Sequence, residues 1–541
     1  MGKFAKLRVL STNWFYIFLI IVIVLGIVIR CINIDSRVYW GDEIFTLMRI
    51  AGYRLTEITK ELINRSTVSI ADLMVYQHPS SAKSLIKTIE ALVVEEPQHT
   101  PIYFIAVRLW TEWFGNLGNT VLVVRSFSVF ISLLIFPCLY WLCFELFQSH
   151  YVGLLAMSMM AVSPFYLVYA QEARPPALWA LFILLSSSLL LKAIRLKTKL
   201  SWIFYTISIV LNLYNFLFSG FVLASHGIYI FLIQGLRITK TKIAYLLAMT
   251  VGILTFLPWM IAITFNLNTI NNATKWSLGK VNFLVLLRVV LNNFRDVFFS
   301  IGAGYQYLTF FLFVLIVFSF YILWLKTPKS TWAFVFSLIG VTVVALLLPD
   351  LLNGNQRSAA SRYFIAAYLG IHISLAHLFY IQLKVVSSWY RKFWQVIISF
   401  LLVLGSVSCI IISQSEVSFN QATYRQSLII ARIINKYDHP LIITHIAGIT
   451  PNYPNNVIGM LSLSNYLSSN TQFQFIADIN KLDVSNNKQD IFLYGNNSDS
   501  IINALHTQYR PKLLFEDLDK NNISSEKLWY LEKVLKVPDQ Y

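Results

Sequence analysis

Apolar runs long enough to cross a membrane recur along the chain as far as residue 413. A helix needs about 20 apolar residues to span roughly 30 Å of hydrocarbon. About eleven segments come near that length, at residues 14–31, 121–146, 151–169, 177–194, 201–217, 219–236, 243–265, 303–325, 331–349, 363–383 and 393–413. The chain is 57% hydrophobic and only 13% charged, too few charges to cover the surface of a soluble protein of this length. We therefore expect a polytopic α-helical membrane protein with about eleven transmembrane helices.

Lys and Arg residues gather at alternate ends of these runs, with no acid among them. They precede the first run and follow the fourth, sixth, eighth and tenth. Their positions are Lys3, Lys6, Arg8, Lys192, Arg195, Lys197, Lys199, Arg237, Lys240, Lys242, Lys326, Lys329, Lys384, Arg391 and Lys392. Basic residues concentrate in cytoplasmic loops, so the pattern predicts a cytoplasmic N-terminus. We interpret the net charge of +17 as this topology signal and expect membrane lipids, not nucleic acid, as partners.

The extracytoplasmic side then receives four segments, namely residues 32–120, 164–176, 266–302 and everything after 413. The first of these is long and mixed in charge. Within it, "LTEITKELINR" and "SAKSLIKTIEALVVEE" are typical of amphipathic helices that lie along the membrane interface. We assign this loop to a transmembrane domain of residues 1–413.

The tail, residues 414–541, is polar and rich in Asn and Ser. Strand-like segments alternate in it with helix-like ones. The strands are "PLIITHI", "FQFIAD", "DIFLYG" and "KLLFED", and the helices are "RQSLIIARIINKY", "NVIGMLSLSNYLSS" and "SDSIINALHTQY". This alternation predicts a small soluble extracytoplasmic α/β domain with a mainly parallel sheet. The tail has no G-x-G-x-x-G segment, so nucleotide binding is not predicted.

Asp42 and Glu43 stand side by side in "VYWGDEIFT", shortly after the first run. Two adjacent acids in a loop are ordinarily solvated, and that interpretation stays open here. Trp40 and Phe45 flank the pair, however, and indicate a partly buried position. Such surroundings can poise a carboxylate as a general base.

Two further polar groups interrupt apolar surroundings near the same face. His99 and Pro101 lie in "EEPQHTPIYFIAVRLWTEWFG", just before the second run. A lone His there is more often a helix cap or a buried hydrogen-bonding group than a ligand. Gln171, Glu172 and Arg174 lie in "SPFYLVYAQEARPPALW". Ionisable groups at membrane depth are candidates for function, with a structural Glu172–Arg174 ion pair as the alternative.

Arg357 and Arg362 lie in "NGNQRSAASRYF", between the ninth and tenth runs, and face the outside, against the inward bias of the other cations. A guanidinium matches the geometry of phosphate oxygens and stays charged in any surroundings. Anchoring to lipid headgroups is the alternative. All the polar groups described so far share the extracytoplasmic face, which predicts a site for a substrate with a lipid tail and a phosphate.

Taken in order, these motifs resemble those of the GT-C glycosyltransferases, in particular the bacterial family 39 group, which is related to protein O-mannosyltransferases and to the lipid A aminoarabinose transferase. The resemblance covers nearly the whole chain, through Asp42–Glu43, "HTPIYF", "SPFYLVYAQEAR", the Arg362–Tyr363 pair and the C-terminal α/β domain. Two positions depart from the family pattern. Thr100 stands where the family has the first proline of a pair. Pro175–Pro176 follows the QEAR segment, where the family often has a Tyr or a similar residue, and this change affects the direction of the next helix.

The resemblance implies a GT-C-type enzyme of the bacterial plasma membrane that takes a sugar from a polyprenyl phosphate and inverts its anomeric carbon. The acceptor would be a hydroxyl of a lipid, a glycan or a protein. Its proton needs a base within hydrogen-bond reach, for which we expect Asp42, supported by Glu43. The departing lipid phosphate needs fixed cations, for which we expect Arg174 and Arg362, with Arg357 in reserve.

We expect His99, Gln171, Glu172 and Tyr363 to position the substrates. Glu43 and His99 are also candidates for binding a divalent metal, as in some relatives, although these two do not by themselves make a ligand set. No other cofactor is expected. A multi-span transporter and a non-catalytic protein that binds lipid-linked glycans are the alternative functions. A transporter would carry its ionisable residues at mid-span, often in two related halves, whereas here they gather at one face.

Overall fold

The computed structural model divides the chain into two compact units. The first comprises Met1–Ser36, Pro97–Tyr103 and Leu122–Ser415, and the second comprises Arg37–Glu96, Phe104–Val121 and Glu416–Tyr541. The structure describes residues 13–80, 82–301, 306–385, 387–418, 421, 424–446, 456–478, 482, 489–495, 498–506, 508–518 and 524–534, so the predicted cytoplasmic residues Lys3, Lys6 and Arg8 lie outside the described part. Contacts between Cα atoms group most of the first loop with the C-terminal tail in the second unit. The predicted domain boundary between residues 413 and 414 stays a prediction.

Eight helices within the described residues are long and apolar enough to cross a membrane. They are α1 (Asn13–Cys31), α7 (Thr120–Phe147), α10 (Pro176–Leu196), α13 (Lys240–Phe265), α16 (Gln306–Lys326), α17 (Lys329–Asn353), α18 (Ile365–Leu383) and α19 (Ser388–Gln414). The shorter apolar helices α11 (Lys199–Leu213) and α12 (Ser219–Gln234) and the pair α8 (His150–Ala161) and α9 (Pro164–Ala170) fill the remaining predicted positions. The predicted class of polytopic α-helical membrane protein is confirmed, while the number of spans stays a prediction.

The third predicted span, residues 151–169, differs from the single helix that the sequence predicted. α8 and α9 meet at an angle of 69°. The break falls at Ser163–Pro164, where the proline has no N–H to continue the hydrogen-bond ladder and disfavours helical backbone in the residue before it. Pro164 is instead the first residue of α9, a position that tolerates proline. The bend turns the segment that carries the QEAR motif away from the axis of α8.

Two glycines allow α1 and α19 to pack closely against this bend. A Cβ on Gly26 would lie 2.3 Å from the carbonyl oxygen of Ala161, and a Cβ on Gly405 would lie 2.5 Å from that of Val162. The buried guanidinium of Arg30, also on α1, donates to the last carbonyls of α8. These groups otherwise have no partner within the helix, so Arg30 stabilises the end of α8. α1 and α19 therefore hold the start of the segment that carries the predicted site.

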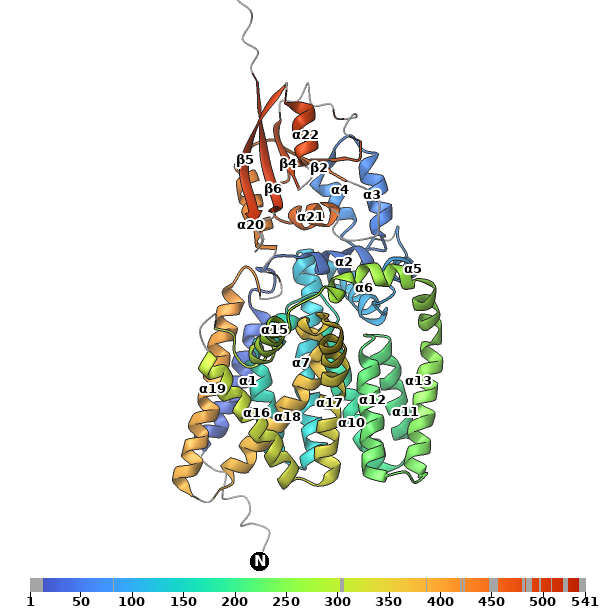
Figure 1. Ribbon diagram of the computed structural model, residues 1–541, viewed down its shortest axis with the longest axis vertical. Coiled ribbons are helices and arrows are strands. Elements are labelled where there is room, and N and C mark those ends of the chain that lie inside the picture. The colour runs from blue at the N-terminus through green and yellow to red at the C-terminus, as the bar shows by residue number, and fades with distance from the viewer. Residues whose placement is uncertain are drawn as a thin grey trace, which may run out of the picture. The chain divides into compact units, whose positions relative to one another are not determined.

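Several connections of the first unit gather at one end of the bundle (Figure 1). The turns from α10 to α11, α12 to α13, α16 to α17 and α18 to α19 lie at one end of the bundle and carry the predicted cytoplasmic cations. Because successive helices run in opposite directions, the α9–α10 turn lies at the other end. So do the 3₁₀ helices η4 (Arg357–Ala359) and η5 (Ser361–Phe364), which follow α17, and the helices α14 (Leu267–Ala273), η3 (Lys275–Leu278) and α15 (Phe283–Asp296), which follow α13. The polar motifs of this unit are thus gathered at one end.

The second unit is built on a six-stranded sheet in the order β1-β3-β2-β4-β6-β5. The strands are β1 (Val68–Ser69), β2 (Pro440–His445), β3 (Gln472–Ile476), β4 (Asp490–Tyr494), β5 (Tyr509–Leu518) and β6 (Ser524–Lys533), and the helices of the tail are α20 (Arg425–Ile434), α21 (Asn456–Leu463) and α22 (Ser498–Leu505). Strand β2 pairs in parallel with β3 and β4, as predicted. The three other pairings are antiparallel, so the prediction of a mainly parallel sheet is wrong.

The antiparallel pairing of β5 with β6 has a simple cause. β5 and β6 follow one another across a short connection, whereas a parallel pair needs a crossover of a dozen or more residues. β1 comes from the first loop and adds to the edge of the sheet beside β3, a pairing between segments far apart in the sequence. The centre of the sheet is aliphatic, and its side chains Ile443, Ile491 and Leu493 are at most 1% exposed.

Short helices make up the rest of the first loop. They are α2 (Gly41–Ile50), α3 (Leu55–Ile63), α4 (Ile70–Val75), α5 (Leu85–Glu95), α6 (Ile102–Phe114) and the 3₁₀ helix η2 (Gly115–Leu117). The two amphipathic helices that the sequence predicted correspond to α3 and α5. α2 carries the acid pair Asp42–Glu43 in its first turn.

Candidate active site

Arg174 and His99 face each other in the first unit. Arg174 lies in the turn between α9 and α10 and is only 6% exposed. Its Nη2 lies 3.4 Å from Nε2 of His99. Because a guanidinium can only donate hydrogen bonds, the imidazole accepts at Nε2 and is neutral in this arrangement. The segments "HTPIYF" and "SPFYLVYAQEAR" therefore meet in space.

The segment that carries His99 is held on both sides by the helix bundle. Trp259 of α13 donates from its indole Nε1 to the carbonyl of Pro97 over 3.0 Å. The backbone N–H of Ile102 donates to the carbonyl of Tyr214, at the end of α11, over 3.1 Å. The backbone on either side of His99 is thus fixed, which restricts where the imidazole can lie.

The turn between α9 and α10 is buried throughout. Glu172 is 2% exposed, and its carbonyl accepts from the backbone N–H of Arg174 over 2.8 Å. Pro175 caps α10 and Pro176 begins it, where a missing N–H leaves no helical hydrogen bond unmade. The two prolines that depart from the family pattern therefore start α10 directly after Arg174.

Gln171, predicted to position substrate, holds the end of α1. Its side-chain nitrogen lies 3.1, 3.0 and 2.8 Å from the carbonyl oxygens of Ile29, Arg30 and Ile32. The last carbonyls of a helix have no partner within it, so the amide of Gln171 acts as a side-chain cap. This contact gives the buried Gln171 a structural task, and its part in substrate binding stays a prediction.

The Arg362–Tyr363 motif lies beside the QEAR segment. The hydroxyls of Tyr169 on α9 and Ser361 on η5 lie 3.5 Å apart. The guanidinium of Arg362 lies 5.5 Å from the ring centroid of Tyr363, within the range of a cation–π contact. The ring of Tyr363 meets that of Phe218 edge-on at 4.4 Å. Motifs from α9 and from the start of α18 are thus neighbours at one end of the bundle.

A hydrogen-bonded loop presents Arg357 in the same region. An oxygen of Asp350 on α17 accepts from the backbone N–H of Ser358 over 2.6 Å, and Asn293 of α15 donates to the carbonyl of Ala359 over 2.9 Å. Arg357 is half-buried, and within the described residues its guanidinium makes no hydrogen bond or ion pair. A cation with unused donors on a fixed backbone is suited to bind phosphate oxygens.

Asp42 and Glu43 lie in the second unit, in the first turn of α2. Trp40 caps this helix, and its carbonyl accepts from the backbone N–H groups of Glu43 and Ile44 over 2.9 and 3.0 Å. Negative side chains at this position are favoured by the positive end of the helix dipole. Glu43 is fully buried and Asp42 is half-buried. The solvated-loop interpretation is therefore wrong for Glu43.

Residues of the tail hold the strand-like segment that leads into α2. The backbone N–H of Val38 donates to the carbonyl of Glu416 over 2.8 Å. Tyr39 uses both of its backbone groups, since its N–H donates to the hydroxyl of Tyr466 and its carbonyl accepts from the hydroxyl of Ser462. Hydrogen bonds to the C-terminal part of the second unit therefore fix the backbone just before the acid pair.

Arg49, near the C-terminal end of α2, ties this helix to the end of α5. Its Nη2 lies 2.9 Å from an oxygen of Glu95, and its Nε lies 2.7 Å from an oxygen of Glu96. Burial opposes the charge on Arg49, but the two carboxylates outweigh burial and raise its pKa. Burial also opposes the charge on Glu95, yet Arg49 and hydrogen bonds from Thr56 outweigh it, so the pKa of Glu95 lies below its ordinary value. This buried ion cluster fixes α2 from its far end.

The predicted site residues thus fall into two groups. His99, Gln171, Glu172 and Arg174 share the first unit with Arg357, Arg362 and Tyr363, whereas Asp42 and Glu43 belong to the second unit. In the part of the chain that the structure describes, no three His, Cys, Asp or Glu side chains gather as a metal-binding set. The two metal candidates, Glu43 and His99, belong to different units.

Some residues of the site were not predicted from the sequence. Tyr169 lies inside the quoted "SPFYLVYAQEAR" segment, but its partner Ser361 is far away in the sequence, and no local pattern joins them. Arg49 did give a signal, since it interrupts the apolar stretch "IFTLMRI". A charge in such a stretch requires a partner when it is buried, which points to acids elsewhere in the first loop.

These features define a class of fold. A bundle of apolar helices holds buried Arg, Glu and His side chains at one end, and the chain also has a strand-containing C-terminal region, as a GT-C-type membrane fold requires.

Comparison with known proteins agrees with this class. A family model described as dolichyl-phosphate-mannose-protein mannosyltransferase matches residues 98–261. The structure of ArnT from Cupriavidus metallidurans bound to undecaprenyl phosphate is similar, with a TM-score of 0.51 and 11% identity over 96% of this chain and 98% of that chain. The apo form of that protein gives a TM-score of 0.53 and 9% identity over the same shares. No curated protein matches the chain in sequence. The predicted resemblance to GT-C glycosyltransferases related to mannosyltransferases and ArnT is confirmed.

Proposed function

We propose that the chain is an integral-membrane glycosyltransferase that moves a hexosyl or pentosyl group from a polyprenyl-phosphate donor to a hydroxyl acceptor. The observation that carries this proposal is the meeting of motifs in the first unit, with Arg174 on His99 and Tyr169 beside Ser361. Two similarities support the donor class. The matching family model is named for a dolichyl-phosphate sugar enzyme, and one similar ArnT structure holds undecaprenyl phosphate.

The cation pattern supports an orientation for this enzyme in a bacterial plasma membrane. The basic turns of the bundle face the cytoplasm, and so does the N-terminus. The end that carries Arg174 and η5 then faces outward, where polyprenyl-linked sugars would be used. Residues 1–413 would supply the membrane-embedded catalytic part, and residues 414–541 would form an extracytoplasmic domain that contacts the acceptor or a partner.

Three Arg side chains are the proposed partners of the donor phosphate. Arg357 offers unused donors on a fixed loop, and Arg174 and Arg362 lie on the two segments that Tyr169 and Ser361 bring together. As the bond to the sugar breaks, negative charge grows on the phosphate oxygens, and cations held in place beforehand stabilise that charge. His99 would orient the guanidinium of Arg174 rather than contact the sugar.

Asp42 is the proposed general base. Neighbouring residues on a helix point about 100° apart, so Asp42 and Glu43 cannot serve the same atom equally. Asp42 is half-buried and reachable by an acceptor, whereas Glu43 is fully buried. Glu43 would therefore support the first turn of α2, while Asp42 takes the proton.

The proposed reaction is one displacement. The acceptor oxygen attacks the anomeric carbon from the face opposite the phosphate, while its proton passes to Asp42. The bond between the anomeric carbon and the phosphate oxygen breaks, and its electron pair leaves with the polyprenyl phosphate. A single displacement inverts the anomeric configuration, which proton NMR of the product would measure.

The test uses the purified full chain with a polyprenyl-phosphate-linked radiolabelled sugar and extracts of membrane lipid, glycan and protein acceptors. Asp42→Asn should lower the transfer rate about a hundredfold or more, since general base catalysis contributes roughly 10²–10⁴-fold. Glu61→Gln is the matched control, because it alters an exposed acid of the same unit and should leave transfer unchanged. A normal rate in Asp42→Asn would overturn the assignment of the base.

Two outcomes would favour the alternative functions. If the wild-type chain binds polyprenyl phosphate but transfers no sugar to any acceptor class, it is a non-catalytic binder of lipid-linked glycans. If it moves the labelled lipid or another solute across vesicles without forming a new glycosidic bond, it is a transporter.

A further inference from the structure

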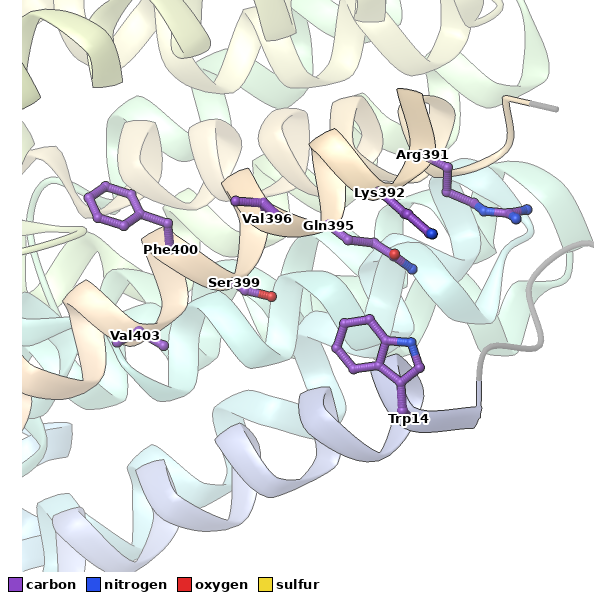
Figure 2. Close-up of a pocket in the computed structure, with 8 residues that line it drawn as sticks. All are labelled: Trp14, Arg391, Lys392, Gln395, Val396, Ser399, Phe400 and Val403. Atoms are coloured by element: carbon purple, nitrogen blue, oxygen red, sulfur yellow. The ribbon is translucent and has the colours of Figure 1, made fainter. Parts of the chain in front are cut away.

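A groove runs between α1 and α19 in the first unit (Figure 2). Its volume is about 590 Å³, within the roughly 300–1,000 Å³ of ordinary ligand clefts. The lining residues are Trp14, Arg391, Lys392, Gln395, Val396, Ser399, Phe400 and Val403. Seven of these eight side chains come from a single stretch of α19, and Trp14 stands opposite them on α1.

The lining changes from polar to apolar along α19. Arg391, Lys392 and Gln395 lie where the helix begins, and their polar ends point to the same side (Figure 2). Farther along, the groove is lined mainly by apolar side chains such as Val396 and Val403, since residues three and four apart share a helix face. A lipid could fill this groove, with its headgroup at the polar end and one acyl chain along the apolar side chains.

Trp14 marks the level of the headgroups. It is the second described residue of α1 and is 54% exposed. Tryptophan is enriched where a membrane-spanning helix leaves the hydrocarbon. The same end of the bundle carries the basic turns. We therefore expect the polar part of the groove at the interface and its apolar part in the hydrocarbon.

The charged side chains that line the groove are all positive. Two cations and a carboxamide line its polar end, and no Asp or Glu is among the lining residues. Gln395 is only 6% exposed, so its amide belongs to the groove wall and not to the open surface. This combination is complementary to a phosphate group, which accepts hydrogen bonds from Arg, Lys and amide donors.

We propose that this groove binds one anionic phospholipid, with its phosphate on Arg391, Lys392 and Gln395 and one acyl chain along the apolar stretch of α19. The groove lies along the first part of α19, from the end of the bundle that carries the basic turns, whereas Arg174 and η5 precede α10 and α18 at the other end, so it is separate from the proposed donor site. A bound lipid would fill the space between α1 and α19, the two helices that pack against the α8–α9 bend through Gly26 and Gly405.

The test is native mass spectrometry of the purified full chain titrated with phosphatidylglycerol or with phosphatidylcholine of the same acyl chains. One phosphatidylglycerol should bind more tightly than phosphatidylcholine. The double variant Arg391→Gln/Lys392→Gln should weaken phosphatidylglycerol binding about 25-fold, because each cation contributes about fivefold in affinity for an anionic lipid surface. It should weaken phosphatidylcholine binding much less, because the choline cation offsets the charge of the same phosphate.

The matched control is Lys326→Gln/Lys329→Gln, which removes two exposed cations from the α16–α17 turn at the same end of the bundle. This control should bind phosphatidylglycerol like the wild type. A second variant, Ser399→Phe, narrows the apolar part without changing charge and should weaken binding of both lipids. Equal affinities of the wild type for the two lipids, or equal losses in the two double variants, would overturn the proposal, provided that each variant keeps the wild-type melting temperature.

Discussion

The guanidinium of Arg174 lies 3.4 Å from Nε2 of His99, so a neutral imidazole accepts from a buried cation at the end of the helix bundle. This contact fixes the direction of the side chain that we assign to the donor phosphate. It also means that removing the imidazole should damage the donor site without removing its charge.

His99→Ala should therefore lower kcat/KM for the polyprenyl-phosphate donor by about 10- to 100-fold, the range expected for losing a hydrogen bond to a charged group. His99→Gln offers an amide oxygen as an acceptor and should recover part of the loss. If the alanine and glutamine variants have equal activity, His99 does not act through Arg174. Steady-state transfer assays at varied donor concentration make this comparison.

Arg357 should contribute to donor binding through direct contact. Its guanidinium has no hydrogen bond or ion pair within the described residues, and its loop is fixed by Asp350 and Asn293. Arg357→Gln should raise KM for the donor by roughly tenfold or more, since a charge-assisted hydrogen bond to phosphate would be lost.

The control for this change is Arg288→Gln, which removes an exposed cation from α15 in the same unit. It should leave the donor KM within about twofold of the wild type, because exposed charges contribute little. Equal effects of the two variants on the donor KM would mean that Arg357 contributes only a nonspecific positive charge and does not contact the donor phosphate.

Much of the fold could be predicted because its signals are local. Each apolar run and each basic turn is visible in a short window of sequence, and the eleven predicted positions all contain apolar helices. The proline of "SPFYL" also marks the 69° bend, although its apolar run predicts one unbroken span there. The three parallel strands of the tail were visible as apolar runs that alternate with amphipathic helices.

What could not be predicted depends on distant pairs. The pairing of Val68 with Phe473 joins the first loop to the sheet of the tail, and nothing near either residue specifies its partner. The same is true of Tyr169 with Ser361 and of Arg49 with Glu95. Such contacts are chosen by the packed structure as a whole, so the sequence showed which side chains needed partners without showing which partners they have.

The buried cluster around Arg49 should be a main source of stability in the second unit. Arg49→Met removes the cation and leaves Glu95 and Glu96 with uncompensated charge, which should lower the free energy of unfolding by about 3–5 kcal/mol. Arg65→Gln breaks an exposed ion pair with Glu61 in the same unit and should cost at most about 1 kcal/mol. Chemical denaturation of the purified chain in detergent measures both variants, and similar losses would contradict the role of burial.

The same cluster predicts a loss of stability in acid. The pKa of Glu95 is lower in the folded chain than its ordinary value of 4.5, because Arg49 and hydrogen bonds from Thr56 outweigh burial. A depressed carboxyl pKa contributes stability that is fully present above about pH 4.5 and is lost as the pH falls through the folded-state pKa. At pH values under about 4.5, the melting temperature of the wild type should therefore decrease as the pH is lowered. Glu95→Gln should show a smaller fall, whereas Glu61→Gln should follow the wild type.

Gln171 provides a test between a structural and a substrate-binding role. Its amide nitrogen lies within 3.1 Å of three carbonyl oxygens at the end of α1, and the residue is 2% exposed. Gln171→Leu keeps the approximate size of the side chain but leaves buried carbonyls unpaired, which should cost about 1–3 kcal/mol of stability. If capping α1 is its main task, the variant should melt at a lower temperature yet keep the donor KM of the wild type at temperatures where it is folded. An unchanged melting temperature combined with a raised KM would instead support the role predicted from the sequence, because the side chain would then be binding substrate and not holding α1.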